Sequence, residues 1–249
     1  MPTDIADGTT VRDLVVRYPQ TRRVLESYRI DCCCDGDREL AIAAAESGAD
    51  LDALRADLRA AIEAASDTGA AAERDWSDAS VAELVDHILR VHHAFLRKQL
   101  PRIAELFEKV VQAYGERDGN TLERLQRVFT SLRNDVDAHL AREEEILFPY
   151  IRSVEVCANA RGDRLGTLRA DVQSSIRQLV CEHDRAGLAL AELAGITSNY
   201  LAPTDACPTF TELYDALREL RTDLRRHVHL ENNILFPKAV ALAQGPLAG

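Results

Sequence analysis

Two segments of the chain, HLAREEEILFP (residues 139–149) and HVHLENNILFP (residues 227–237), share the pattern H-x-x-x-E-x-x-I-L-F-P. They begin 88 residues apart and form an internal repeat. On an α-helix, residues i and i+4 lie on one face, so His139 with Glu143, and His227 with Glu231, each present an imidazole and a carboxylate to one volume. The apolar run after each pair indicates core-facing helix, where an uncompensated glutamate would be costly. The repeat therefore predicts two halves of one metal site.

Single histidines precede the two halves at similar distances. His93 lies 46 residues before His139, and His183 lies 44 residues before His227. We therefore expect two helical hairpins, each offering one histidine and then a His/Glu pair. If both glutamates bridge, each of two metals receives two nitrogens and two oxygens, and positions remain open for oxygen, nitric oxide or a bridging oxide. Imidazole and carboxylate without thiolate favour iron or manganese over structural zinc, and we expect two iron ions.

Composition predicts an all-α protein. Aromatic residues make up 5% of the chain, Gly and Pro are few, and the long stretches of Ala, Leu, Glu and Arg are typical of helices. A net charge of −11 opposes binding to nucleic acid or to an anionic bilayer. The first ten residues lack the basic and apolar segments of an export signal, and the sequence contains no run of about 18 apolar residues. We expect a cytoplasmic protein without nucleic-acid or membrane partners.

The chain divides into two expected domains joined by a linker. Residues 1–66 are predicted to form a small helical module. Its first helix is expected over about 10–18, its second after Pro19 and up to about 30, and the others over 39–47 and 51–65. Residues 66–72 (SDTGAAA) are polar or small and carry no apolar stripe, so residues 67–76 are predicted to form the linker. Residues 77–242 are predicted to form an up-down four-helix bundle.

Start and stop signals delimit the four bundle helices. A capping box, Ser80 with Glu83, opens the first helix, Pro101 is expected to kink it, and the sequence GERDGN (residues 115–120) ends it. The second helix is expected to stop at Pro149, the third to cover about 165–199, and the fourth to run from Thr209 to about Pro237.

Periodicity leaves the ligand in the first helix open between His92 and His93. At 100° per residue His92 lies nearer the centre of the apolar face, although a kink at Pro101 would shift that phase. His87 and His229 have no counterpart in the repeat, so we expect them to face solvent or to lie outside the ligand set.

Several motifs together resemble the hemerythrin-like di-iron proteins of the RIC family (repair of iron centres, the YtfE/ScdA type). The resemblance spans nearly the whole chain. It rests on an N-terminal helical module with cysteines after a helix, and on motifs at residues 30–34, 86–88, 99–101, 139–149, 182–184 and 227–237. The resemblance implies a hemerythrin-like fold and the ligands His93, His139, His183 and His227, with Glu143 and Glu231 bridging the irons.

At one position the chain departs from the family pattern. The family places a further histidine late in the first long helix, and counting from Pro101 puts Tyr114 there. Three interpretations stay open: a phenolate ligand to ferric iron, a hydrogen-bond donor to a bound molecule, or a vacant position that leaves one iron more open.

The resemblance also implies a redox pair, Cys33 and Cys34. Cys32 replaces the aromatic residue usual before them. Adjacent thiols after a helix are more open to exchange than core cysteines, but nearby aspartates should raise their pKa. Cys157, Cys181 and Cys207 are interpreted as packing residues.

The function that the resemblance implies is repair of iron–sulfur clusters damaged by nitric oxide or peroxide, through donation of iron to iron–sulfur proteins as clients. A catalytic alternative is reduction of NO at the di-iron site. A third is sensing or binding of O2 or NO, which the cysteine module counts against. A homodimer is one assembly that we keep open.

Overall fold

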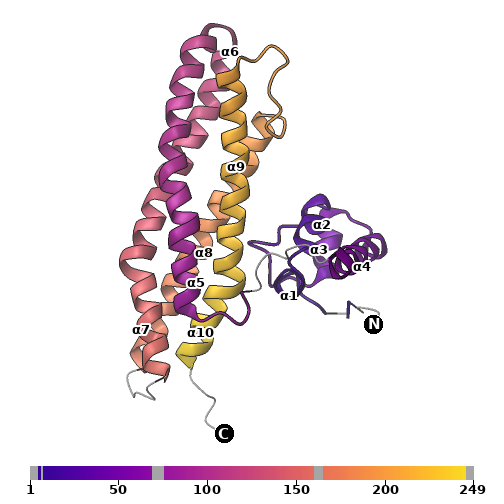
Figure 1. Cartoon of the computed structure of the whole chain (residues 1–249), viewed down its shortest axis with the longest axis vertical. Helices are drawn as coiled ribbons and strands as arrows, with labels where there is room; N and C mark the ends of the chain where they lie inside the picture. The colour runs from indigo at the N-terminus through magenta and orange to yellow at the C-terminus, as the bar shows by residue number, and fades with distance from the viewer. Residues whose placement is uncertain (1–4, 7, 69–75, 160–164, 245–249) are drawn as a thin grey trace. The chain divides into compact units, whose positions relative to one another are not determined.

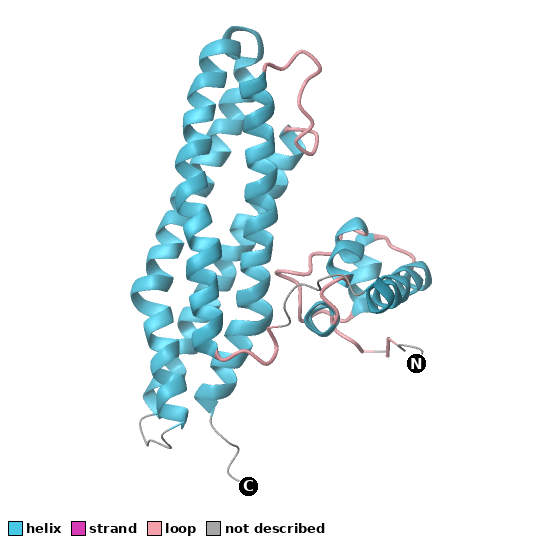
Figure 2. Cartoon of the chain, viewed as in Figure 1, coloured by secondary structure: helices cyan, strands magenta, loops and turns pink. Residues whose placement is uncertain are grey.

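Helices account for most of the described residues (Figures 1 and 2). The computed structural model describes residues 5–6, 8–68, 76–159 and 165–244, and within them the only β-type pairing is one isolated bridge between Thr10 and Glu39. The predicted all-α class is confirmed. The chain divides into two compact units, one of residues 1–80 with 228–238 and one of residues 81–227 with 239–249.

The N-terminal segment forms four helices close to those expected. They are α1 (Val11–Arg17), α2 (Thr21–Ser27), α3 (Leu40–Ser47) and α4 (Leu51–Thr68). Thr10 begins α1 through a capping box with Asp13, and Gly48 ends α3 with a positive φ of 73°. Most of the predicted linker, residues 69–75, lies outside the described residues. The boundaries at 66 and 77 therefore stay a prediction.

The later part of the chain forms the long helices of the bundle. Their bounds are α5 (Val81–His87), η1 (Ile88–His93), α6 (Ala94–Arg142), η2 (Glu143–Leu147), α7 (Phe148–Asn159), α8 (Leu165–Ile196), α9 (Pro208–Leu230), η3 (Glu231–Leu235) and α10 (Phe236–Gln244), where η marks a π-helical turn. The first helix begins at Val81, directly after the first residue of the predicted capping box.

The long element α6 contains a reversal of the chain. A straight helix of 49 residues would separate its ends by about 70 Å. Instead His93 Nε2, next to its start, lies 3.4 Å from Glu143 Oε2, next to its end, and the rings of Phe107 and Phe129 are 5.1 Å apart. The backbone keeps local helical geometry through the GERDGN segment, but the two arms of α6 lie side by side (Figure 1).

Two predicted helix ends are wrong. The helices continue past Pro149 to Asn159 and past Pro237 to Gln244. Each proline is the second residue of an α-helix that follows a π-helical turn. The helix continues without a break through each π-helical turn, so neither proline lies at a free helix start. The π-helical turn before each proline shifts the backbone hydrogen-bond pattern, and the helix continues past the missing N–H.

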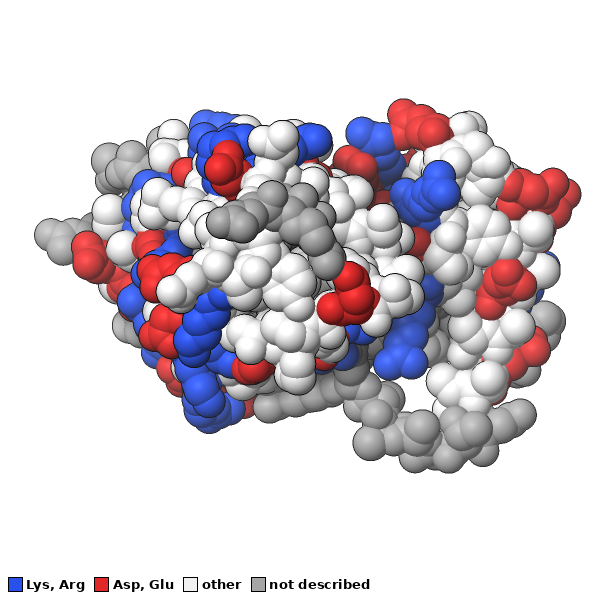
Figure 3. Space-filling model, turned by 90° about the horizontal axis from the view of Figure 1, so that it is seen from above, with Lys and Arg blue, Asp and Glu red and all other residues white. Residues whose placement is uncertain are grey.

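The bundle core is a continuous apolar cluster between the arms. Its largest members, including Phe107, Phe129 and Leu217, are fully buried. Burial of this kind supplies most of the free energy that holds amphipathic helices together. No described helix is long and apolar enough to cross a membrane. Acidic and basic side chains are interspersed over the face shown in Figure 3.

Candidate metal centre

Six buried side chains converge in the helical bundle. They form two overlapping groups whose ligand atoms lie within 4.8 Å of one another: His93, Glu143, His227 and Glu231 in one, and His139, Glu143, His183 and Glu231 in the other. We call these the His93 position and the His139 position. The two positions share both glutamates, each fully buried. The structure thus brings together all six residues that the sequence singled out as imidazole and carboxylate ligands.

The two oxygens of Glu143 face different imidazoles. Glu143 Oε1 lies 3.4 Å from His139 Nε2, and Glu143 Oε2 lies 3.4 Å from His93 Nε2 and 4.0 Å from His227 Nε2. His183 Nε2 and His139 Nε2 are 3.0 Å apart, so both rings point to the same volume. One carboxylate that reaches two imidazole sets is the arrangement required of a bridge between two metals.

Three π-helical turns carry candidate ligands of the site. His93 ends the turn η1, while Glu143 and Glu231 begin the turns η2 and η3. π-helical turns are rare and are often found at functional sites. The turn at η1 also explains the ambiguity between His92 and His93. A π-helical turn holds more residues per turn than an α-helical one, which shifts the phase that a count of 100° per residue assumes, and the structure places His93 in the cluster.

Carboxylates contact the outer nitrogens of two imidazoles of the cluster. His93 Nδ1 lies 2.8 Å from Glu144 Oε1, and His139 Nδ1 lies 2.8 Å from Glu182 Oε2. An outer carboxylate fixes the tautomer of a metal-binding histidine, leaves Nε2 for the metal and increases its basicity. Sequence reasoning assigned these two carboxylates no role, although Glu144 follows Glu143 and Glu182 precedes His183.

Both outer carboxylates are held in the ionised form. Burial raises the pKa of Glu182, but hydrogen bonds from His139, Arg142 and Gln178 outweigh it and lower the pKa to about 2. Burial likewise opposes ionisation of Glu144, while hydrogen bonds from Arg97 and His93 lower its pKa overall. The imidazoles that they contact are therefore backed by negative charge over the whole neutral range.

Replacement of Glu182 by glutamine should weaken metal binding at the His139 position. The amide keeps the size of the side chain but removes the charge that backs His139, and loss of such an outer partner typically costs about 10–100-fold in affinity. Competition with a chelator of known affinity measures the change. Glu192→Gln, on the exposed face of the same helix, is the matched control. Equal affinities in Glu182→Gln and the parent protein would contradict the assignment.

The donor set fits a pair of iron ions. Two buried glutamates would carry a large desolvation cost without nearby positive charge, and two divalent cations would supply that charge. Four imidazoles and two carboxylates, with no thiolate among them, match the preference of non-haem iron. When bound, iron would supply a redox couple and open coordination positions at this site.

The structure does not bring Tyr114 to the ligand cluster. Its ring packs 5.1 Å from that of Phe210, and its hydroxyl oxygen accepts a hydrogen bond of 2.9 Å from the backbone N–H of Cys207. Phe210 precedes the ligand His227 by 17 residues on α9, a separation of about 25 Å along the helix. Tyr114 is thus too distant to bind iron or a molecule held by it, and the geometry favours a packing role.

Replacement of Tyr114 by phenylalanine should leave the visible spectrum of the iron-loaded protein unchanged. The substitution removes the hydrogen bonds of the Tyr114 hydroxyl with the backbone N–H and the side chain of Cys207, so we expect a loss of about 0.5–1.5 kcal/mol per bond in the free energy of unfolding. Absorption spectroscopy and chemical denaturation measure the two effects. Disappearance of a visible charge-transfer band in the variant would contradict this placement.

The candidate redox cysteines belong to the first unit. Cys33 is buried, Cys34 is half-buried, and both backbone N–H groups donate to Asp31 Oδ1, at 2.8 and 3.3 Å. The side-chain amides of Asn232 and Asn233 donate to the carbonyls of Cys33 and Cys32, at 3.0 and 2.8 Å. The backbone of the cysteine loop is therefore well defined, and Cys34 is the more accessible thiol of the pair.

Other predicted positions have mixed outcomes. Cys181 is exposed, so its interpretation as a packing residue is wrong, whereas Cys207 is half-buried and packs against the bundle core. The side chain of Cys157 lies outside the described residues.

His229 does not face solvent: it is buried, and its Nδ1 lies 2.9 Å from the side-chain nitrogen of Asn233. His87 is half-buried and packs edge-on to His92.

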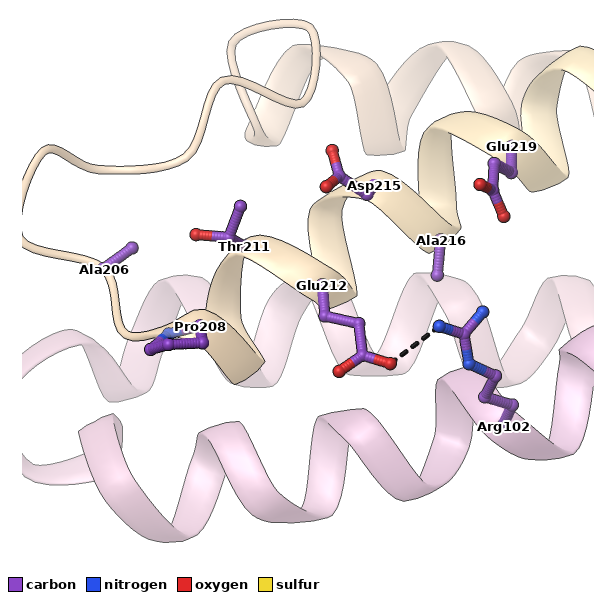
Figure 4. A pocket seen from close by; sticks show the side chains of 8 residues that line it. All are labelled: Arg102, Ala206, Pro208, Thr211, Glu212, Asp215, Ala216 and Glu219. Atoms are coloured by element: carbon purple, nitrogen blue, oxygen red, sulfur yellow. Dashed lines mark hydrogen bonds and ion pairs between the residues drawn. The ribbon is translucent and has the colours of Figure 1, made fainter.

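A charged surface pocket lies apart from the ligand cluster. It has a volume of about 500 Å³ and is lined by α6 and the start of α9, where Arg102 and Glu212 form an ion pair of 2.7 Å (Figure 4). The lining residue nearest in sequence to a ligand is Glu219, eight residues before His227 and hence about 12 Å away along α9. The candidate site is the buried cluster and not this pocket.

Comparison with known families agrees with this geometry. The family model of the hemerythrin HHE cation-binding domain matches residues 84–239. The family model of a domain of unknown function, ScdA_N, matches residues 7–62. The iron–sulfur cluster repair protein YtfE of Escherichia coli is 32% identical over 229 residues, which cover 92% of this chain and 95% of the relative. The chain belongs to the RIC family. Its expected hemerythrin-like bundle is thereby confirmed.

Further RIC relatives match over the same extent. A Haemophilus influenzae protein named "Probable iron-sulfur cluster repair protein" is 32% identical over 231 residues, and YtfE of Escherichia fergusonii is 31% identical over 229. Each match covers 92% of this chain and 95% of the relative. The hemerythrin HHE domain of the RIC family is a di-iron domain, and the buried His/Glu cluster lies within the matched residues.

Proposed function

We propose that this chain is a di-iron protein that repairs iron–sulfur clusters damaged by nitrosative or oxidative stress, and that it donates iron from the His/Glu centre. The observation that supports this most directly is the pair of overlapping ligand groups that share Glu143 and Glu231. Ferrous iron on nitrogen and oxygen ligands is held less firmly than the later divalent metals, so this ligand set suits a centre that releases its iron.

Transfer of iron to a damaged client tests the proposal. The iron-loaded full-length chain would be mixed anaerobically with an iron–sulfur enzyme that has lost one iron from a cubane cluster. We expect the client to regain activity while the donor loses a matching amount of iron. The His139→Ala/His227→Ala variant is the control for free iron. A donor that keeps its iron while the client stays inactive would contradict iron donation.

Reduction of NO is the second candidate, and the shared glutamates are the observation that favours it. Two adjacent ferrous ions could supply the two electrons that convert two NO and two protons into N2O and water. Anaerobic addition of NO to the reduced protein, with an electron donor present, should then yield N2O over several turnovers. Formation of no N2O would exclude this activity. Reversible binding of O2 or NO without turnover would support the third candidate, sensing or binding.

We propose the remaining assignments on chemistry and family resemblance. The clients are iron–sulfur proteins of the cytoplasm, and Cys33 with Cys34 acts as a redox pair during repair. Two adjacent cysteines, one of them half-buried, support the pair. Titration of reduced thiols before and after repair checks it, because an unchanged count would contradict a redox role. Sedimentation equilibrium decides whether the chain forms a homodimer.

A further inference from the structure

His92 is a buried histidine that belongs to neither ligand group. Only 4% of its surface is exposed, and its Nδ1 lies 2.9 Å from Asp223 Oδ1. Its ring lies parallel to that of the ligand His227, with centroids 5.6 Å apart and an angle of 8° between the planes. His92 is thus fixed on one side by a carboxylate and packed on the other against a residue of the His93 position.

The internal repeat gives His92 a counterpart in Glu182. His92 directly precedes His93, and Glu182 directly precedes His183, the corresponding histidine of the second hairpin. Glu182 reaches across to His139, a ligand from the first hairpin, and His92 reaches across to His227, a ligand from the second. In both halves the residue before the single histidine supports the His/Glu pair of the opposite hairpin.

The two supports differ in chemistry. Glu182 is a carboxylate that contacts a ring nitrogen of His139, so it orients that ligand and increases its basicity. His92 contacts the face of the His227 ring, which restricts its orientation by packing and places no carboxylate on a ring nitrogen. Asp223 lies one helical turn before His227 on α9 and therefore shares its face of the helix, where it holds His92 in place.

We propose that His92, held by Asp223, is a positioning residue for His227. It affects the quadrupole doublet and the iron release of the His93 position, and not those of the His139 position. Glu182 does the same for the His139 position. Each position has one imidazole backed by a carboxylate, Glu144 on His93 and Glu182 on His139, and His92 adds a stacked ring at the His93 position. The centre then holds two inequivalent irons although its ligand set is symmetric. The inference rests on the di-iron centre and is independent of whether iron is donated to a client.

Mössbauer spectroscopy of the full-length chain loaded with 57Fe tests the proposal. The reduced wild-type protein should give two quadrupole doublets of equal area. His92→Phe keeps an aromatic ring but loses the bond to Asp223, and Asp223→Asn keeps the size of the side chain but changes its charge. Both variants should shift one and the same doublet. Glu182→Gln should shift the other.

Release of iron gives a second measurement. Extraction by a ferrous chelator should show two phases in the wild type, and His92→Phe should accelerate one of them by about 10-fold, the lower end of the effect of outer partners. Asp135→Asn is the matched control, because Asp135 stands four residues before His139, as Asp223 does before His227, but is exposed. It should change neither phase.

The outcomes separate cleanly. The inference would be overturned if His92→Phe and Glu182→Gln shifted the same doublet. It would also be overturned if one or both of His92→Phe and Asp223→Asn shifted no doublet. Loss of both irons from Asp223→Asn would likewise overturn it, because His92 and Asp223 would then support the whole centre. Failure of the wild type to give any di-iron signal would contradict the centre itself, and the inference with it. Failure of iron transfer alone would leave the two doublets distinct.

Discussion

Replacement of His139 and His227 together by alanine is expected to abolish tight iron binding. The two substitutions remove one imidazole from each metal position and leave each with a single histidine and the shared glutamates. Iron content, measured by a colorimetric assay after gel filtration, should fall from two ions per chain to nearly none. The helical content should persist, because the apolar bundle core does not include these side chains.

His87→Ala is the matched control for this double variant. His87 is a half-buried histidine of the same bundle, close to the site but outside both ligand groups. Its replacement should leave two irons per chain. Retention of two irons by the double variant, with an unchanged visible spectrum, would show that the metal lies elsewhere.

Replacement of Glu143 by glutamine should weaken both metal positions at once. Glu143 belongs to both ligand groups, and a neutral amide is a poorer ligand and a poorer bridge than a carboxylate. Loss of outer partners alone costs about 10–100-fold, so loss of a shared ligand should cost more than about 100-fold in affinity at each position. Chelator competition measures these affinities. A His183→Ala variant should weaken mainly the His139 position.

The same substitution should have the opposite effect on the metal-free protein. Glu143 is fully buried, and a buried carboxylate without a cation is costly, so Glu143→Gln should raise the Tm of the apo form. Glu145→Gln is the control, because Glu145 is exposed two residues further along the same turn. It should change neither affinity nor Tm. A lower apo Tm in Glu143→Gln would mean that the carboxylate stabilises the fold without metal.

The candidate ligand set is predictable from the sequence because a repeat of His/Glu pairs in core-facing helix would be unstable without a cation to compensate the carboxylates. His139, Glu143, His227 and Glu231 follow from spacing alone, and only family resemblance distinguishes His93 from His92. Spacing cannot decide that choice, because it assumes an ideal helix where the chain forms a π-helical turn. Similar turns precede the helices that begin just before Pro149 and Pro237, which is why neither proline ends a helix.

Other features depend on contacts between distant segments. Glu144, Glu182 and Asp223 are ordinary helix-surface residues in sequence, and their roles depend on which helix packs opposite. Alignment with the family pattern, by counting from Pro101, places Tyr114 near the iron. Tyr114 follows His93 by 21 residues on one helical arm, however, so the two residues lie about 30 Å apart. A rise of 1.5 Å per residue is sufficient to exclude it.

The three π-helical turns also bear on how such a centre could be gained or lost during evolution. A π turn holds one residue more than the α turn that it replaces, so deletion of a single residue there would restore regular helix and leave the residues beyond it in nearly the same phase. Glu143 and Glu231 each stand at the start of such a turn, and the core-facing ILFP run follows. One codon lost at either place would keep the apolar run that follows in phase with the core, but it would remove the local turn that carries the glutamate.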